Sequence, residues 1–251
     1  MSIYVTGDTH GNARDICNVI AQIKNPSKDD FVIIAGDAGF EYESYVMRQA
    51  KKEARKFPGT WIVLRGNHDS SYWKMHEEDP DWEIIQHQGC DYLRQKNYPN
   101  IWYLPDAGCI YRIQNFNILF IPGAYSVDKW YRLRNRYPWN PSEQLSVKER
   151  NELNLLVTEW IDLDFNIDFV IAHTFPAKME KYYRDLFMSG LDQSTVDKTT
   201  EIWLNEMSNI YENAPGFKHY FGGHFHDDRR LNKKYTMLYD EVEDLADYVK
   251  E

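Results

Sequence analysis

The chain has 251 residues, of which 43% are hydrophobic, 15% aromatic and 27% charged, and its formal net charge is −10 at pH 7. This composition is that of a globular protein, and the length is sufficient for one layered α/β domain over residues 1–251. The acidic balance argues against tight, non-specific binding to nucleic acid, which needs a basic surface. Metal-assisted chemistry on a phosphate stays open, because bound cations reverse the sign of the local field.

The three cysteines, Cys17, Cys90 and Cys109, are odd in number and far apart in the sequence. We therefore expect reduced thiols rather than a disulfide framework. No charged and then apolar leader precedes Ile3, and no apolar run approaches 18 residues, so neither a signal peptide nor a membrane span is predicted. Together these features predict a cytoplasmic protein without a membrane partner.

The N-terminal part of the chain repeats a strand–loop–helix plan. The apolar runs Ile3–Val5, Phe31–Ile34 and Trp61–Leu64 predict short buried strands. Between them, helices are predicted from the capping residue Asn12 to about Lys24 and from Glu41 to about Lys56. Strands that alternate with helices in this way indicate a parallel sheet with right-handed crossovers.

Beyond residue 100 the pattern changes to that of β-strands. Trp102–Leu104, Cys109–Ile113 and Asn117–Ile121 predict three strands joined by tight turns, the start of a second and largely antiparallel half. The capping-box pattern Ser146-Val147-Lys148-Glu149 predicts a helix to about residue 161. The same criteria predict a strand at 83–86, a helix at 199–211, strands at 168–172, 217–221 and 235–239, and a short C-terminal helix.

Polar side chains with metal-binding chemistry follow five of these strands at the point where each ends. They are Asp8 and His10, then Asp37, then Asn67 with His68 and Asp69, then His173, and finally His224 with His226. Singly these signals are weak, because an Asp-x-His pair is more often a polar loop and a lone histidine is more often structural. The carboxyl ends of parallel strands meet at one edge of a sheet, so we expect the five segments to converge there.

The residue types predict which ions these segments bind. Carboxylate, imidazole and one amide oxygen, without a thiolate, suit two divalent cations such as Mn, Fe, Zn, Ni or Mg. Two ions about 3.5–4 Å apart can hold a bridging hydroxide as the nucleophile that attacks phosphorus. We expect one ion to be held by Asp8, His10 and His226, the other by Asn67, His173 and His224, and both by a bridging Asp37.

As an ordered set, these segments resemble the five signature segments of the calcineurin-like metallophosphoesterases, over residues 7–226. The matching runs are Gly7-Asp8-Thr9-His10, Gly36-Asp37, Gly66-Asn67-His68-Asp69, His173 and Gly223-His224-Phe225-His226. The resemblance implies a four-layer αββα sandwich, two metal ions with Mn foremost, and hydrolysis of a phosphoester such as a nucleotide, a dinucleotide or a phosphoprotein. It also implies that His68 contacts the substrate phosphate or protonates the leaving oxygen, with Asp69 setting its orientation.

The sequence departs from one branch of this superfamily. Ser/Thr protein phosphatases carry a phosphate-gripping Arg in the second segment, and the run Gly36–Glu41 lacks it. The aromatic and basic run Tyr125–Pro141 is a candidate substitute. As an extended loop it would place the alternating Arg132, Arg134 and Arg136 on one face, where they bind the substrate as a lid. The alternative is a surface loop whose aromatic side chains pack on the core while the arginines stay solvated.

Two other functions are compatible with these ligands. A DNA or RNA nuclease of the same superfamily would share them, but the acidic balance and the lack of a basic patch argue against it. A metal-free scaffold would retain the fold alone. Such scaffolds usually show substituted ligands, whereas every ligand position here carries a competent residue.

Overall fold

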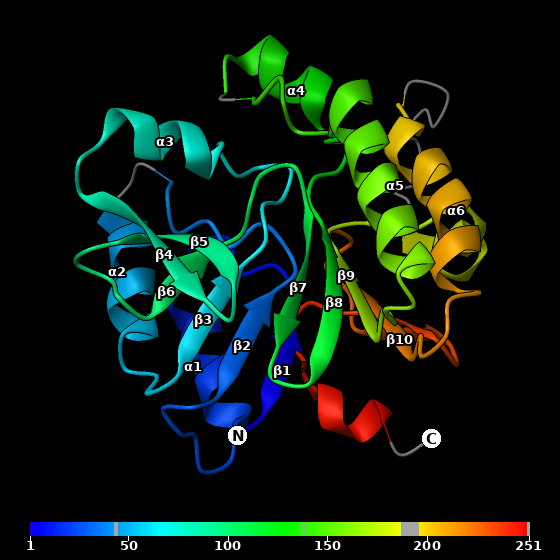
Figure 1. Ribbon diagram of the computed structural model, residues 1–251. Coiled ribbons are helices and arrows are strands. Elements are labelled where there is room, and N and C mark those ends of the chain that lie inside the picture. Colours follow the sequence, from blue (N-terminus) through cyan, green and yellow to red (C-terminus); the bar gives the residue numbers. More distant parts are fainter. Residues whose placement is uncertain (43–44, 138, 187–195, 250–251) are drawn as a thin grey trace.

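The computed structural model of the chain describes residues 1–42, 45–137, 139–186 and 196–249. Two mixed β-sheets face each other, and helices cover their outer faces (Figure 1). The predicted α/β architecture, a four-layer αββα sandwich, is therefore confirmed. Among the described residues, no helix is both long and apolar enough to cross a membrane.

The first sheet contains seven strands within the described ranges, in the order β13-β1-β2-β3-β6-β5-β4. Strands β1, β2, β3 and β6 run parallel, whereas β13, β5 and β4 are antiparallel to their neighbours. Helices α1 (Ala13–Gln22) and α2 (Tyr45–Ala54) contribute to the core on its outer face, and the short α3 (Tyr72–Glu78) precedes β4. The strands are β1 (Ile3–Thr6), β2 (Phe31–Ile34), β3 (Thr60–Val63), β4 (Trp82–His87), β5 (Cys90–Gln95), β6 (Ile101–Tyr103) and β13 (Val242–Asp244).

The second sheet has the order β11-β12-β10-β9-β8-β7 in the described part of the chain. Helices α5 (Val147–Asp162) and α6 (Thr199–Tyr211) pack on its outer face. Its strands are β7 (Cys109–Ile113), β8 (Phe116–Ile121), β9 (Phe169–Ala172), β10 (His219–Gly222), β11 (Arg229–Asn232) and β12 (Tyr235–Met237). The short 3₁₀ turns are η1 (Ala177–Tyr182), η2 (Arg184–Leu186) and η4 (Leu245–Tyr248).

Alternating side chains divide the core into three apolar layers. In β2, Phe31 and Ile33 point between the sheets, whereas Val32 and Ile34 point towards α1 and α2. Strand β9 is likewise buried on both faces, with Phe169 and Ile171 on the inside. Because both faces are covered, such strands appear in the sequence as continuous apolar runs. Their polar residues are confined to the loops, which is where the candidate site lies.

Two predictions about the second half of the chain are wrong. The predicted strand Trp102–Leu104 forms β6, but it pairs in parallel with β3 and so belongs to the first sheet. The second sheet is not largely antiparallel, because β8–β9, β9–β10 and β10–β12 all pair in parallel. A short apolar run has the same appearance whichever partner it takes. The sequence analysis also missed strands β5, β11 and β13.

The predicted extended loop Tyr125–Pro141 contains a helix, α4 (Lys129–Asn135), which is seen at the top of the molecule in Figure 1. Its residues are competent helix formers without Gly or Pro. Arg132 and Arg134 are two positions apart, about 200° around the helix, so they do not share a face. Arg136 ends the helix in a left-handed conformation with φ 58°. Pro138 lies outside the described residues.

Replacing Ser146 with Ala should destabilise the protein by about 1 kcal/mol, because the predicted capping box is present. The Ser146 side chain accepts a hydrogen bond from the backbone N–H of Glu149 at 3.3 Å, and the Ser146 N–H donates to the Glu149 carboxylate at 2.7 Å. Urea unfolding measures the loss, and Ser146→Asp, which retains a capping oxygen, is the matched control. Equal stability of all three proteins would show that the cap is energetically unimportant.

Candidate metal centre

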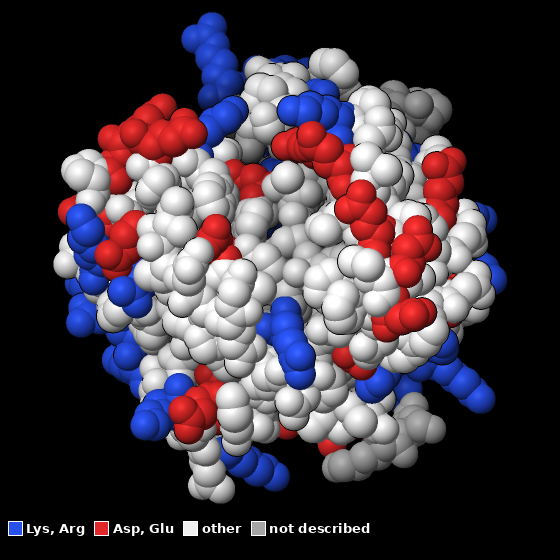
Figure 2. Space-filling view, in the orientation of Figure 1, with Lys and Arg blue, Asp and Glu red and all other residues white. Residues whose placement is uncertain are grey.

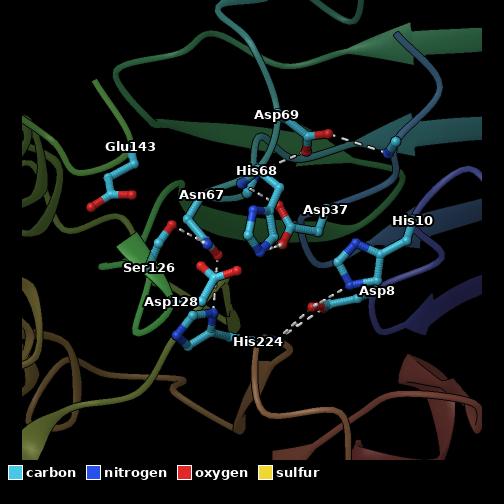
Figure 3. Close-up of polar contacts among 12 residues, drawn as sticks. Asp8, His10, Asp37, Asn67, His68, Asp69, Ser126, Asp128, Glu143 and His224 are labelled. Carbon is cyan, nitrogen blue, oxygen red and sulfur yellow. Dashed lines mark hydrogen bonds and ion pairs between the residues drawn. The ribbon is translucent and has the colours of Figure 1, made fainter. Parts of the chain in front are cut away.

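Five loops at the carboxyl ends of strands bring the predicted ligands to one place between the two sheets. The loops after β1, β2 and β3 come from the first sheet, and those after β9 and β10 come from the second. Figure 3 shows side chains from the loops after β1, β2, β3 and β10 converging. The structure therefore brings together all seven predicted metal ligands: Asp8, His10, Asp37, Asn67, His173, His224 and His226.

Several of these ligands have a strained backbone. Asp37, His10, His224 and His226 have φ values of 47°, 45°, 74° and 52°, in the left-handed region that non-glycine residues rarely adopt. Such strain costs about 1–3 kcal/mol per residue and clusters at functional sites. The chain accepts it here because short loops must turn side chains back towards a common point.

Asp8, His10 and His226 form the first ligand set. The Nε2 atoms of the two histidines are 2.8 Å apart, and Asp8 Oδ2 lies 3.4 Å from that of His226 and 3.8 Å from that of His10. The backbone N–H of His224 donates to both Asp8 oxygens, at 3.0 and 3.2 Å. Asp8 is buried, whereas His226 reaches solvent. Two imidazole nitrogens that face each other beside a buried carboxylate are the geometry of a cation site open on one side.

The second ligand set converges on Asn67. Its Oδ1 lies 2.7 Å from His173 Nε2 and 3.0 Å from His224 Nδ1. Asp37 Oδ2 lies 3.5 Å from His173 Nε2, while Asp37 Oδ1 accepts the backbone N–H of His68 at 2.8 Å. Asp8, Asp37 and His173 also have ligand atoms within 4.8 Å of one another. Asp37 is therefore close enough to both sets to serve either.

His173 is favoured as a cation between the two buried carboxylates. Both ring nitrogens of His173 face acceptors, because Nδ1 lies 2.9 Å from the carbonyl oxygen of Ala35 and Nε2 lies beside Asn67 Oδ1. Burial lowers the pKa of His173, but the charges of Asp37 and Asp8 outweigh it and raise this pKa to about 9. Conversely, burial would raise the pKa of Asp37, but the His173 cation holds it well below its usual range. Burial and the same cation lower the pKa of His224, which stays neutral.

The donor set fits two divalent ions. Each predicted ion has a carboxylate and imidazole nitrogens within reach, and the second also has an amide oxygen. These are ligands of borderline and hard cations. His173 also has the outer contact expected of a ligand, since Nδ1–H donates to the Ala35 carbonyl and leaves Nε2 to face the site. The residues present thus match the cofactor prediction of two divalent ions.

His68 and Asp69 lie beside the ligands in different surroundings. The His68 ring is half-buried, with Nε2 4.0 Å from Asp37 Oδ2. Burial lowers the pKa of His68, the charge of Asp37 raises it, and the charge of Arg132 lowers it further. Asp69 is buried, and its carboxylate accepts the backbone N–H groups of Gly66 at 2.9 Å and Gly39 at 3.2 Å.

Asp69 therefore connects two turns by hydrogen bonds. One turn carries Asn67 and His68, and the other follows Asp37. Burial and the charge of Asp37 raise its pKa to about 7. Within the described residues, no hydrogen bond joins its carboxylate to the His68 ring. The expected role of Asp69 in orienting that ring remains a prediction.

The three predicted substrate arginines differ in position. Arg132 pairs through Nε with Asp128 Oδ2 at 2.7 Å, and its charge lowers the pKa of His68. Arg134 and Arg136 are exposed. Helix α4 thus places the charge of Arg132 near enough to His68 to affect its pKa, whereas Arg134 is exposed to solvent.

Several polar residues near the site were missed by the sequence analysis. The hydroxyl of Tyr42 is buried and has no hydrogen-bond partner in the described part of the chain. Ser126 accepts a hydrogen bond from Asn67 Nδ2 at 2.8 Å, and the buried Glu143 lies beyond it. Only Tyr42 had a local signal, since it follows the segment that lacks the phosphatase Arg. Ser126 and Glu143 reach the site through tertiary contacts that the sequence does not reveal.

A sequence model of the family described as calcineurin-like phosphoesterase matches residues 1–228. No curated protein matches the chain. One similar solved structure is a protein of unknown function, AQ665 from Aquifex aeolicus, with 12% identity and a TM-score of 0.35, covering 69% of this chain and 80% of that chain. Another is phosphopantetheinyl hydrolase (PptH) from Mycobacterium tuberculosis, with 15% identity and a TM-score of 0.47, covering 95% of this chain and 88% of that chain. Both likenesses are too distant to bear on function.

Metal binding should release a proton from His173, because its Nε2 carries a proton in the metal-free protein and must offer a lone pair to an ion. With a pKa raised to about 9, the release should be complete at about pH 7 and vanish above pH 9. The apparent affinity should therefore fall as the pH is lowered through 9. Calorimetric titration with Mn²⁺ in buffers of different ionisation enthalpy counts the protons.

The His173→Asn variant separates this proton from that of His226, whose pKa is also raised, chiefly by its hydrogen bond to Asp8. The variant should release about one proton fewer than the wild type at pH 7. Identical proton release by the two proteins would mean that His173 is neutral before the metal binds.

Proposed function

The chain belongs to the calcineurin-like phosphoesterases, which hydrolyse phosphoesters with divalent metal ions, and we propose that its substrate is a small or exposed phosphoester. We also propose that its seven converging ligands hold two ions. The observation that carries this proposal is the convergence of two ligand sets on either side of Asp37. One ion would be held by Asp8, His10 and His226, the other by Asn67, His173 and His224, with Asp37 between them. Manganese is the first candidate, and Fe, Zn, Ni and Mg suit the same donors.

When bound, the ions would lower the pKa of a water molecule and neutralise charge on the phosphoryl group. The chain supplies the remaining functions. His68 lies at the half-buried rim of the site, next to Asp37 but outside both ligand sets. From there it can donate its ring N–H to a phosphoryl oxygen or pass a proton to the leaving oxygen.

Arg132 and Tyr42 are our candidates for the donors that replace the missing phosphatase Arg. Burial and the carboxylates Asp69, Asp37 and Asp8 raise the pKa of Tyr42, so the hydroxyl keeps its proton at neutral pH and can donate it. The charge of Arg132 acts on both Tyr42 and His68. Its ion pair with Asp128 holds the guanidinium on that side of α4. A buried donor without a partner fits a substrate oxygen.

The surroundings of α4 support a nucleotide or dinucleotide as substrate, with a phosphoprotein as the alternative. Trp130 and Tyr131 are 58% and 61% exposed, and Tyr137 is also exposed. Aromatic side chains left in solvent beside a phosphate site can stack on a base.

A nuclease is a weaker second candidate. On the face seen in Figure 2, basic and acidic side chains are interspersed and form no single basic surface. Nonspecific nucleic-acid binding would need such a surface.

The free cysteines Cys17, Cys90 and Cys109 fit a cytoplasmic location.

A panel of substrates and metals tests the proposed function. Phosphomonoesters, phosphodiesters, nucleotides and a phosphopeptide would each be offered with Mn²⁺, Ni²⁺, Mg²⁺ and Zn²⁺. Asp37→Asn is the control, because it should weaken both ion sites whereas His10→Ala disturbs one. Absence of hydrolysis under every condition, or two tightly bound ions in Asp37→Asn, would reject the proposal.

Replacing His68 with Ala should leave both ions bound and reduce kcat by roughly 10²–10⁴, the usual effect of losing a general acid. A nitrophenyl ester needs little help from an acid, so its hydrolysis should fall less than that of an alkyl ester. Steady-state kinetics with both esters and the metal content of the variant decide between roles. Equal losses would assign His68 to phosphate positioning, and loss of metal would make it a ligand.

Arg132→Ala should lower kcat/KM by about 1.5–3 kcal/mol, and Tyr42→Phe by about 0.5–1.5 kcal/mol, the ranges for charged and neutral hydrogen bonds. Arg134→Ala is the matched control, since it removes an exposed charge from the same helix. The measurement is steady-state kinetics together with thermal unfolding. Wild-type kcat/KM in the Arg132→Ala and Tyr42→Phe variants would mean that neither side chain binds the phosphoryl group. The metals, Asn67 and His68 would then bind it alone.

A further inference from the structure

The proposed metal ligand Asn67 is connected by a short run of buried polar groups to the base of the segment 126–143, which contains α4 and is called the α4 segment below. Asn67 Nδ2 donates to Ser126 Oγ at 2.8 Å, and Figure 3 shows Ser126 between Asn67 and Glu143. Ser126 and Glu143 are 1% and 2% exposed. A polar group buried this completely must be hydrogen-bonded or it destabilises the fold.

Glu143 lies at the far end of this run. Burial raises its pKa, whereas hydrogen bonds from the Ser126 hydroxyl, the Trp139 indole and the Ser126 backbone N–H lower it. The indole Nε1 of Trp139 lies 2.7 Å from Glu143 Oε2. An indole N–H only donates, so Trp139 donates to the Glu143 carboxyl group. Ser126 and Trp139 thus both lie against this buried carboxyl group.

The contact with Ser126 sets the orientation of the Asn67 amide. Asn67 Nδ2 donates to the Ser126 oxygen at 2.8 Å, so the NH₂ end of the amide faces Ser126. The opposite end of the amide, Oδ1, then points at His173 and His224. An amide is nearly symmetric in shape, so packing alone would not distinguish its oxygen from its nitrogen.

We propose that Ser126 and Glu143 are positioning residues that orient the Asn67 oxygen towards one of the two ions. This inference rests on the proposed role of Asn67 as a metal ligand. It predicts an asymmetry, because Ser126 contacts the set of Asn67, His173 and His224 and not the set of Asp8, His10 and His226. Outer contacts of this kind typically change metal affinity by about 10–100-fold.

The same groups connect Asn67 to α4. The backbone N–H of Lys129, the first residue of α4, donates to the Ser126 carbonyl at 3.0 Å. Its ammonium group lies 4.3 Å from the ring centroid of Trp139, the residue that donates to Glu143. The two ends of the α4 segment are thus joined at Glu143, directly behind a metal ligand. Trp139→Phe keeps the ring under Lys129 and removes only the donor to Glu143.

Calorimetric titration of the metal-free protein with Mn²⁺ alone tests the proposal. Ser126→Ala should weaken one of two binding events by about 10–100-fold and leave the other unchanged. Ser126→Thr, which keeps the hydroxyl, should restore the affinity, and Glu143→Gln should reproduce part of the loss. Ser208→Ala is the matched control, because Ser208 is equally buried and hydrogen-bonded but belongs to α6.

Two backgrounds identify the affected ion. In His226→Ala, which retains the Asn67 set, adding Ser126→Ala should still weaken the remaining ion. In His224→Ala, which damages that set, the same addition should leave the remaining ion unchanged. Wild-type affinities in Ser126→Ala, an equal loss at both ions, or an equal loss in Ser208→Ala would overturn the inference. Fewer than two Mn²⁺ ions in the wild-type protein would instead overturn the proposed function.

Discussion

The burial of Asp8, Asp37 and His173 between the ends of two sheets is the constraint that shapes this molecule. Their exposed fractions are 2%, 1% and 0%. Withdrawing such charges from water costs several kcal/mol each unless they are compensated. Compensation comes from the backbone: His224 donates to Asp8, His68 donates to Asp37, and the Ala35 carbonyl accepts from His173. The loops must therefore stay close-packed around the site.

That close packing explains the local backbone chemistry. A Cβ atom at Gly36, where φ is +101°, would lie 2.1 Å from His173 Nδ1, so no other residue fits there. Asp69 contributes in the same way, because its carboxylate joins the turns after β2 and β3 through Gly39 and Gly66. The positive φ values of the ligands belong to the same pattern, in which strain is retained because the surrounding contacts over-determine it.

The convergence of the candidate ligands could be predicted from the sequence because each one follows a strand whose apolar run is visible locally. His173, for example, comes directly after β9, and Asp37 follows β2 after a short turn. Strand pairing could not be predicted, since Ile101–Tyr103 carries no mark of its choice of β3 as partner. Helix α4 was missed because alternating arginines were assigned to an extended chain. Ser126 and Glu143 had no signal at all, because Ser126 meets Asn67 across 59 positions of the sequence.

The segment between Ser126 and Glu143 leaves the body of the protein and returns to it at nearly the same point. The backbone N–H of Ala124 donates to the Glu143 carbonyl at 3.1 Å, which closes the segment at its base. Helix α4 within it has no buried residue, so its sequence is free of core constraints. The exposed residues of α4 beyond Lys129 can therefore be exchanged without disturbing the candidate ligands. Divergence of specificity on this scaffold then requires the replacement of one surface excursion, while the hydrolytic centre is inherited unchanged.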